Sequence, residues 1–440
     1  MTLIEQQKRI YQSKSIIELR ELGRSVGVKS PTSLSKEQLV NHIVAICFGG
    51  ELPANKETRG RPAKKKFLDD PYTYIANEFK SELDDVVHTF AASNNKSSSR
   101  HVTKYEGYAS EDYTKTGKLY TSNFCRENFC EKVDPELVEI RPADLLTFSE
   151  EEGVRTLVMV NRLSIQTIKK RGSFDMLTPS NLRARVFKLA EPSAQKALDG
   201  FAPAMFGGRT IICSGANSEL ADYLEMFAGA EKEGLAAEII PLFSSAIKER
   251  YKSFEDKTGR EIIRFEKSDP KETIRVAKFC LERAKRVIEM GLDAILLIDN
   301  LVELAKICQQ AGDKDLEFIR ELFMSGMCDV NGGTITVIVG IDRTSAFGEK
   351  IFTELEPYAT NRITFDRAYL TYGVPVPIDL NETFNIDKGA YTEAEMALKK
   401  ECLKVYYGGK TPDRIDELMT IVSTMSEADA LEKIKHTKFE

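Results

Sequence analysis

The sequence predicts an α/β fold whose larger part is a mainly parallel sheet with helices on both faces. From residue 176 onward, short apolar runs alternate with helix-like runs, and this alternation indicates parallel strands joined by crossover helices. The clearest strands are AILLID (294–299) and TITVIVGI (334–341). Further strands are expected at 209–213, 237–243, 261–265 and 362–365.

The helix expected over 270–290 carries the strongest local signals. Ser268 or Asp269 can cap it, Pro270 lies in its first turn, and Gly291 ends it. Apolar residues recur on one of its faces, at Ile274, Ala277, Leu281, Ala284 and Ile288. Shorter helices are expected over 219–233 and 300–311, so each crossover can cover the sheet.

The chain before this α/β domain divides by composition. The expected parts are a helical module at 1–48, a basic linker at 49–66, a second linker with one possible helix at 67–100, a β-rich domain at 101–175 and the α/β domain at 176–440. In the helical module, Ser33 or Ser35 can cap the second helix. The clearest strand of the β-rich domain, VRTLVMVNRLSIQTI, is expected to bend near Asn161.

Composition excludes several classes of protein. The net charge is −6, so a nucleic-acid site must be a local patch. We find no apolar run near the roughly 20 residues that a membrane span needs, and the N-terminus is too polar for a signal peptide. The 8 cysteines form no CxxC pair, which favours free thiols in a cytoplasmic protein. Cys125 and Cys130 near His101 could instead make a partial metal site.

A basic cluster in the linker is the sharpest short motif. RGRP (59–62) is followed by KKK (64–66) in an otherwise acidic protein. A flat Arg-Gly-Arg-Pro segment can enter a narrow A·T minor groove, and the motif resembles an AT-hook. The residues expected to contact AT-rich DNA are Arg59, Gly60, Arg61, Pro62, Lys64, Lys65 and Lys66. The alternative is a solvated basic linker.

Two segments bear on nucleotide binding. IICSGANSELADYL (211–224) has the outline of a phosphate-binding strand, loop and helix, but Glu219, Leu220 and Ala221 stand where lysine and a hydroxyl would be needed. Asp299 ends an apolar strand, where an aspartate can hold magnesium. Its alternative role is to cap the helix that starts at Asn300.

The order of these parts resembles bacterial transcription termination factor Rho. The α/β domain is similar to the RecA-like motor domain of that family, the β-rich domain lies where its OB-fold, cold-shock-like RNA-binding domain belongs, and residues 15–46 resemble its N-terminal module and SAP-type modules. The similar segments of the motor domain are LTPSNLRARVFKLAEP (177–192), the run 265–306, GGTITVIVGIDRTSAFGEKIFTEL (332–355), NRITFDRAYLTYGVPVPIDL (361–380) and TEAEMALKKECLKVYY (392–407).

The same alignment shows departures from the family. The phosphate-loop glycine, lysine and hydroxyl fall on Glu219, Leu220 and Ala221, the catalytic glutamate on Ala246, and the lysine of the RNA-translocating loop on Ala346. Only Asp299 and the arginine-finger match Arg367 remain. Positioned groups of this kind are each worth roughly 10²–10⁴ in rate. The resemblance with these departures predicts a chain that is not an enzyme and takes neither ATP nor magnesium.

The β-rich domain raises a separate question. EGYASEDYTKTGKLY (106–120) fits the family's RNA-stacking hairpin, yet Lys118 stands where an aromatic ring would stack. Tyr113 and Tyr120 could serve as stacking platforms, with Lys115 and Lys118 on the backbone. Ordinary strand packing is the equal alternative for both tyrosines.

These observations predict an oligomeric, Rho-like DNA- or RNA-binding factor that regulates termination without hydrolysing ATP. Its expected partners are AT-rich DNA, single-stranded RNA, further copies of itself in a ring or filament, and an active Rho or RNA polymerase, in the bacterial cytoplasm or nucleoid. The alternatives are an active RNA-dependent NTPase that uses Asp299 and Arg367, a structural DNA-coating protein, and an inhibitory partner of an active Rho.

Overall fold

The computed structural model separates the chain into a first unit, 1–77, and a second unit, 78–440. The residues that it describes are 16, 19, 20, 28, 32, 34–48, 103–151, 153–181, 198, 200–214, 237–244, 252, 254–256, 261–313, 315–330, 332–366, 369, 371, 372, 374, 378–386 and 391–439. None of the helices in these ranges combines the length and apolar composition that a membrane crossing needs.

The first unit contains one described helix, α3 (Lys36–Phe48). Ser35 caps it as expected, because the Gln38 amide donates to Ser35 Oγ at 3.3 Å and the Ser35 amide donates to Gln38 Oε1 at 3.0 Å. Leu39 and Val40 on this helix are fully buried. The linkers at 49–66 and 67–100 lie outside the described residues.

The second unit begins with a six-stranded antiparallel sheet in the order β3-β2-β1-β4-β5-β6. The strands are β1 (Thr103–Ala109), β2 (Lys118–Tyr120), β3 (Glu127–Cys130), β4 (Leu145–Glu151), β5 (Val154–Val160) and β6 (Leu163–Ser164), with the short helices α5 (Tyr113–Thr116) and α6 (Ile165–Ile168). The expected bend is present, since Asn161 and Arg162 have φ of 53° and 64° between β5 and β6. The region is therefore β-rich, as predicted.

The larger sheet is mainly parallel, which confirms the predicted α/β class. Its order is β10-β9-β11-β13-β8-β14-β15, and β12 and β7 extend it beside β13. The strands are β7 (Pro179–Ser180), β8 (Arg209–Ser214), β9 (Ala237–Ser244), β10 (Ile263–Phe265), β11 (Asp293–Asp299), β12 (Met327–Asp329), β13 (Thr334–Asp342), β14 (Asn361–Thr364) and β15 (Phe384–Asn385). Every residue of β11 after Asp293 is buried, as expected for a central strand covered on both faces.

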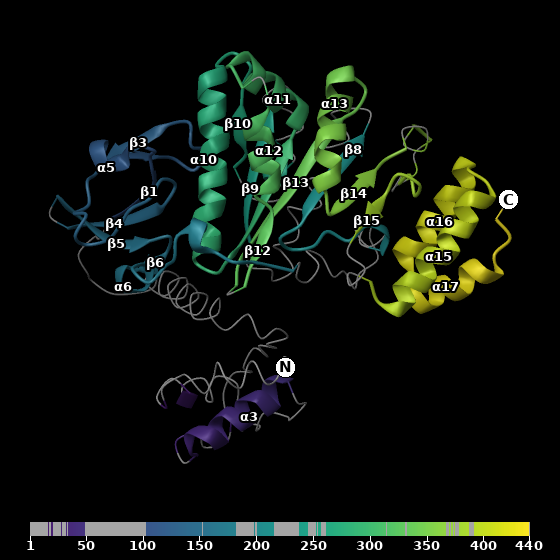
Figure 1. The fold of residues 1–440 in the computed structure, drawn as a ribbon, viewed down its shortest axis with the longest axis horizontal. Coiled ribbons are helices and arrows are strands. Elements are labelled where there is room, and N and C mark those ends of the chain that lie inside the picture. Colours follow the sequence, from purple (N-terminus) through teal and green to yellow (C-terminus); the bar gives the residue numbers. More distant parts are fainter. Residues whose placement is uncertain are drawn as a thin grey trace. The chain divides into compact units, whose positions relative to one another are not determined.

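Helices pack on this sheet, and the last three helices of the chain form a group beside one end of it (Figure 1). They are α10 (Pro270–Glu289), α11 (Leu301–Gln310), α12 (Glu317–Met324), α13 (Ala346–Leu355), α15 (Glu393–Gly408), α16 (Pro412–Thr424) and α17 (Glu427–His436). Asp269 caps α10 by accepting from the Glu272 amide at 3.0 Å. Gly291 follows the helix at φ 71°, a conformation that favours glycine.

Helix α10 joins the two sheets of the second unit (Figure 1). Its Phe279 ring packs edge-on against Tyr120 and Phe124 of the antiparallel sheet, at centroid distances of 5.4 and 4.9 Å. Arg275 Nη1 donates to Glu111 at 3.0 Å, and Glu289 accepts from Arg141 at 3.0 Å. One face of α10 therefore holds the antiparallel sheet along the helix's whole length.

Lys399 of α15 connects the C-terminal helices to the segment that precedes β8. Its ammonium donates to the Phe201 carbonyl and to the Tyr391 hydroxyl, both at 2.8 Å. Burial lowers the pKa of Lys399 from 10.5 to about 8. The folded state therefore binds fewer protons than the unfolded state between these two pH values, and folding becomes more favourable as the pH rises through that window.

We expect Lys399→Met to remove this dependence. The stability of the wild type relative to the variant should rise as the pH increases from about 8 to 10.5, as measured by urea unfolding at each pH. The exposed Lys350→Met is the control and should leave the slope unchanged. A flat difference between wild type and Lys399→Met across this range would contradict the assignment.

Candidate functional site

The carboxyl edge of the parallel sheet contains a topological switch point. Strands β8 and β13 are neighbours, and their last residues pair in register, Ser214 with Asp342. The chain leaves β8 towards β9 on one side and leaves β13 towards β14 on the other. In open α/β sheets, ligands bind beyond the carboxyl ends of the strands at such a point.

Asp299 lies at this edge, at the end of β11. The residue is 1% exposed. Helix α11 is capped by the next residue, because Asn300 Oδ1 accepts from the Val302 amide at 2.8 Å. Capping therefore does not account for Asp299. Ser244 ends the neighbouring β9 and is also buried, so carboxylate and hydroxyl oxygens, the donors that magnesium prefers, lie at the ends of adjacent strands.

Two residues of α11, the helix that follows Asp299, form a charged triad with Lys267, and the sequence analysis did not predict it. Glu303 in the first turn pairs with Lys267 at 2.5 Å and with Lys306 at 2.9 Å. Burial alone would raise the pKa of Glu303, but the two ammonium groups outweigh it and lower the pKa. The Lys267 side chain is well exposed just beyond β10, so this edge presents a cation. The Glu-x-x-Lys spacing could have predicted the Glu303–Lys306 pair. No local pattern could have predicted that Lys267 lies beside Glu303, because the two residues are distant in the sequence.

An arginine cluster lies at the end of β13. Arg343 donates to both oxygens of Glu349, at 2.8 and 3.1 Å, and its guanidinium lies 4.0 Å from the centroid of the Phe352 ring. The Glu382 carboxylate forms ion pairs with the same arginine at 3.6 Å and with Arg362 at 3.3 Å. These pairings fix the loop between β13 and α13, so the cluster is first of all structural.

The α13 loop itself is tight. Ser345 caps α13 by accepting from the Gly348 amide at 3.0 Å, and Ala346 is the first residue of the helix. A Cβ atom on Gly348 would lie 1.9 Å from the Asp342 carbonyl oxygen, so only glycine fits there. Burial raises the pKa of the nearby Cys213 thiol to about 12, which keeps it protonated. Cys213 is therefore a small buried side chain of the sheet.

The two tyrosines singled out for RNA stacking are both in the interior. Tyr113 is 4% exposed and donates to the Glu131 carbonyl at 2.7 Å. Tyr120 is 7% exposed and donates to Glu111 at 3.1 Å. Burial raises the pKa of Tyr120 to about 12. Neither ring offers a face to a base in this structure, which favours the packing alternative.

The remaining predicted residues are placed as follows. Lys118 pairs with Glu127 at 3.0 Å, and Lys115 is exposed on α5. The other residues lie outside the described part of the chain: Arg59, Gly60, Arg61, Pro62, Lys64, Lys65, Lys66, His101, Glu219, Leu220, Ala221, Ala246 and Arg367.

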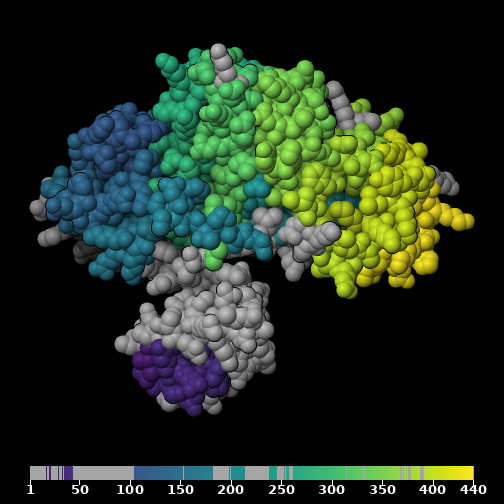
Figure 2. Space-filling model, in the orientation of Figure 1, coloured from purple at the N-terminus to yellow at the C-terminus, as the bar shows by residue number. Residues whose placement is uncertain are grey.

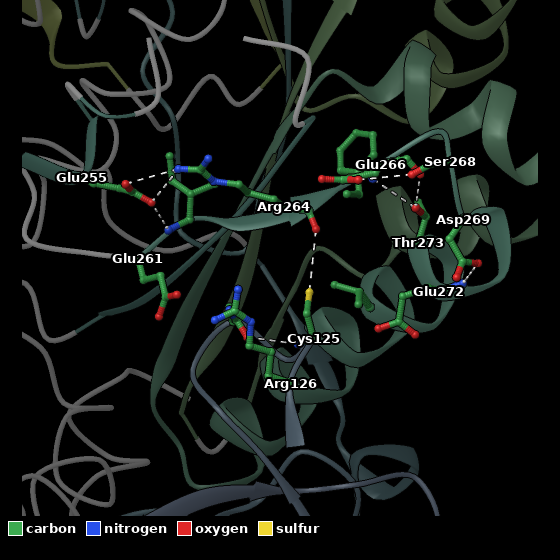
Figure 3. Close-up of a pocket in the computed structure, with 14 residues that line it drawn as sticks. Cys125, Arg126, Glu255, Glu261, Arg264, Glu266, Ser268, Asp269, Glu272 and Thr273 are labelled. Carbon is green, nitrogen blue, oxygen red and sulfur yellow. Dashed lines mark hydrogen bonds and ion pairs between the residues drawn. The ribbon is translucent and has the colours of Figure 1, made fainter. Parts of the chain in front are cut away.

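A pocket separate from the switch point lies between the antiparallel sheet and the start of α10 (Figure 3). It measures about 820 Å³ and is lined by acidic and basic side chains. Arg264 pairs with Glu255 at 3.2 Å, and Cys125 Sγ lies 3.9 Å from the Arg264 carbonyl. Burial raises the pKa of Cys125, so this thiol is held protonated. The pocket lies beyond β10, at the margin of the sheet and away from the switch point.

Comparisons with known proteins identify relatives. No family model matches the chain. It is 24% identical over 285 residues to transcription termination factor Rho of Akkermansia muciniphila, covering 60% of this chain and 59% of that one. The Rho factors of Thermotoga maritima and Mycobacterium tuberculosis are each 24% identical, over 62% and 59% of this chain and 64% and 46% of theirs. A solved type III secretion system ATPase from pathogenic bacteria is 15% identical with a TM-score of 0.48, covering 67% of this chain and 93% of its own.

These relatives correct two predictions. Since they are Rho factors, and the resemblance assigns that family an ATP-hydrolysing motor, the predictions of no enzyme and of no ATP or magnesium are wrong. Both assumed that Leu220 and its neighbours align without gaps and that phosphate binding needs a lysine. Backbone amides at a helix start also bind phosphate. The chain spans about half the length of the curated relatives it matches, and its similarity to the first of them covers 60% of its own length.

Proposed function

We propose that this chain is a nucleic-acid-dependent nucleoside triphosphatase of the Rho type that acts in transcription termination. The observation that carries the proposal is Asp299, a buried carboxylate at the end of central strand β11 beside the switch point. The capping role that would explain it structurally belongs to Asn300. The similarity to Rho factors gives this geometry its chemical context.

The residues at this edge fit a magnesium nucleotide. Asp299 and Ser244 would hold the ion through oxygen atoms, and the ammonium of Lys267 would face the phosphates. Bound magnesium supplies charge neutralisation on the phosphate oxygens. The chain's own contribution is positional, because β11 pairs with β13 as far as Ile298 and with β9 through Asp299, which fixes the Asp299 backbone.

Nucleotide binding is the direct test of this site. Saturating ATP with magnesium should raise the melting temperature of the full chain, since a ligand at 100 times its Kd stabilises the folded state by about 2.7 kcal/mol. ATP with EDTA should give a smaller shift. An unchanged melting temperature at millimolar ATP and magnesium would oppose the proposal.

The parts before the motor domain keep their predicted roles as part of the proposal. The helical module at 1–48 and the linker at 49–66 would contact DNA, the linker at 67–100 would join them to the OB-fold-like domain at 101–175, and the domain at 176–440 would assemble into a ring or filament. An active Rho or RNA polymerase stays a proposed partner. Gel filtration with light scattering would test the assembly by measuring the molar mass of the particle with and without RNA.

The linker prediction has its own test. Arg59→Ala combined with Arg61→Ala should weaken binding to an AT-rich duplex at least tenfold and weaken binding to a GC-rich duplex less, because only the narrow A·T groove concentrates negative potential on arginine. Lys271→Ala with Lys278→Ala is the control for lost charge. An equal loss of affinity for the AT-rich and the GC-rich duplex would show that the motif is only a solvated basic segment.

A further inference from the structure

The outer face of helix α15 carries a row of cations that ends in an exposed aromatic ring. Lys400, Lys404 and Tyr407 follow one another at helical spacing, so their side chains share this face. Tyr407 is 67% exposed. Figure 2 shows the C-terminal helices, in yellow, as open surface of the second unit.

Helix α17 adds charge to the same face. Glu401 accepts from Lys404 at 2.7 Å, and its pKa is lowered first by that hydrogen bond and further by the charges of Lys435 and Lys400. Lys404 is in direct contact with Glu401, and the charges of Lys435 and Lys400 act on the same carboxylate, so cations outnumber carboxylates in this group. We call Lys400, Lys404, Lys435 and Tyr407 the C-terminal basic face.

Complementing helix dipoles does not explain this arrangement. The basic residues Lys433, Lys435 and His436 lie in the last turn of α17, where cations are favourable. Helix α15 has no basic residue in its last turn, and Lys400 lies near its middle. The helix dipole therefore accounts for the α17 cations and not for the two α15 lysines, of which Lys404 also pairs with Glu401.

The tyrosine is held ready for stacking. Its ring packs edge-on against the buried Tyr406 ring, at a centroid distance of 6.0 Å and an interplanar angle of 83°. Tyr406 is fixed in turn, because its hydroxyl donates to Asp379 at 2.9 Å. Because the Tyr406 ring already restricts the Tyr407 side chain, Tyr407 loses little conformational entropy when a base stacks on its exposed ring.

We infer that the C-terminal basic face binds single-stranded nucleic acid, with the lysines on successive phosphates and a base on Tyr407. The α15 lysines are about 6 Å apart along the helix axis, which suits neighbouring phosphates of an extended strand. Lysines that track the backbone beside an aromatic platform are the usual elements of such sites. The choice of ligand rests on the proposed function, and the interior positions of Tyr113 and Tyr120 leave the stacking role to another surface.

The test is fluorescence anisotropy of the full chain with labelled 12-mers of uridine and of thymidine, without nucleotide, over a salt series. Lys400→Glu with Lys404→Glu should weaken binding at least tenfold and reduce the slope of log K against log salt by about 1.4. The matched control is Lys271→Glu with Lys278→Glu, two exposed lysines on α10. Circular dichroism should show all variants folded.

The tyrosine has a separate readout. Tyr407→Ala should weaken binding about 5- to 150-fold with an unchanged salt slope, because stacking is worth about 1–3 kcal/mol per base. Tyr407→Phe should bind like the wild type. Equal affinities and slopes for the α15 pair and the α10 pair would overturn the inference, and so would wild-type binding by Tyr407→Ala. Because no ATP is present, failure of the NTPase proposal would not change these results.

Discussion

Replacing Arg283 by methionine should destabilise the second unit by about 2–3 kcal/mol, because it removes a buried donor from polar partners of which Glu238 is only partly buried. The Arg283 side chain is 4% exposed in the middle of α10. It donates to both oxygens of Glu238, at 2.6 and 2.7 Å, and to Asn161 Oδ1. It also donates to the Ala143 carbonyl at 3.2 Å.

The electrostatic balance explains the size of this effect. Burial alone would lower the pKa of Arg283, but Glu238 outweighs it and raises the pKa, so the charged pair is stable in place. Methionine can fill much of the volume but donates no hydrogen bond. The Glu238 carboxylate would then lose its charged partner, and Asn161 Oδ1 would keep only the Leu145 amide as a donor.

Urea unfolding followed by circular dichroism measures the change. The control is Arg320→Met, which breaks an exposed pair with Glu354 and should cost less than about 1 kcal/mol. If the loss in unfolding free energy of Arg283→Met were within about 1 kcal/mol of that of this control, the Arg283 contacts would not stabilise the packing of α10 on the antiparallel sheet.

Changing Asp299 to asparagine should lower ATP turnover by about 10²–10⁴, the range for removing one positioned charged group from an active site. The substitution keeps the shape of a buried side chain and removes its charge, so the fold should survive. Phosphate release in the presence of single-stranded RNA measures the effect. Asp315→Asn, an exposed carboxylate beyond α11, should turn over like the wild type. A variant within threefold of the wild type would remove Asp299 from the site.

The sequence predicted the elements whose signals are local. Helix α10 begins and ends where Asp269, Pro270 and Gly291 indicated, because capping groups and turn residues lie within a few positions of the bond they make. Strand β11 was equally visible, since a central parallel strand is an uninterrupted apolar run. The bend at Asn161 followed from the same kind of signal.

Contacts between distant segments were beyond this reasoning. Tyr120 meets Phe279 across 159 positions, and Arg283 meets Asn161 across 122, so neither pair leaves a pattern in any short window. The Tyr113 and Tyr120 rings looked equally suited to a base and to a core until α10 and the hairpin enclosed them. The ATPase prediction failed for a related reason, because it judged the site from single aligned positions such as Leu220 and Ala246 and not from the sheet edge that carries Asp299.

The most direct test of the central claim is ATP hydrolysis by the purified full chain, measured as phosphate release with magnesium, with and without single-stranded RNA. We predict magnesium-dependent turnover that RNA increases at least tenfold and that Asp299→Asn lowers by about 10²–10⁴. Phosphate release no faster than that of Asp299→Asn, with or without RNA, would contradict the claim that this sheet edge is an NTPase site.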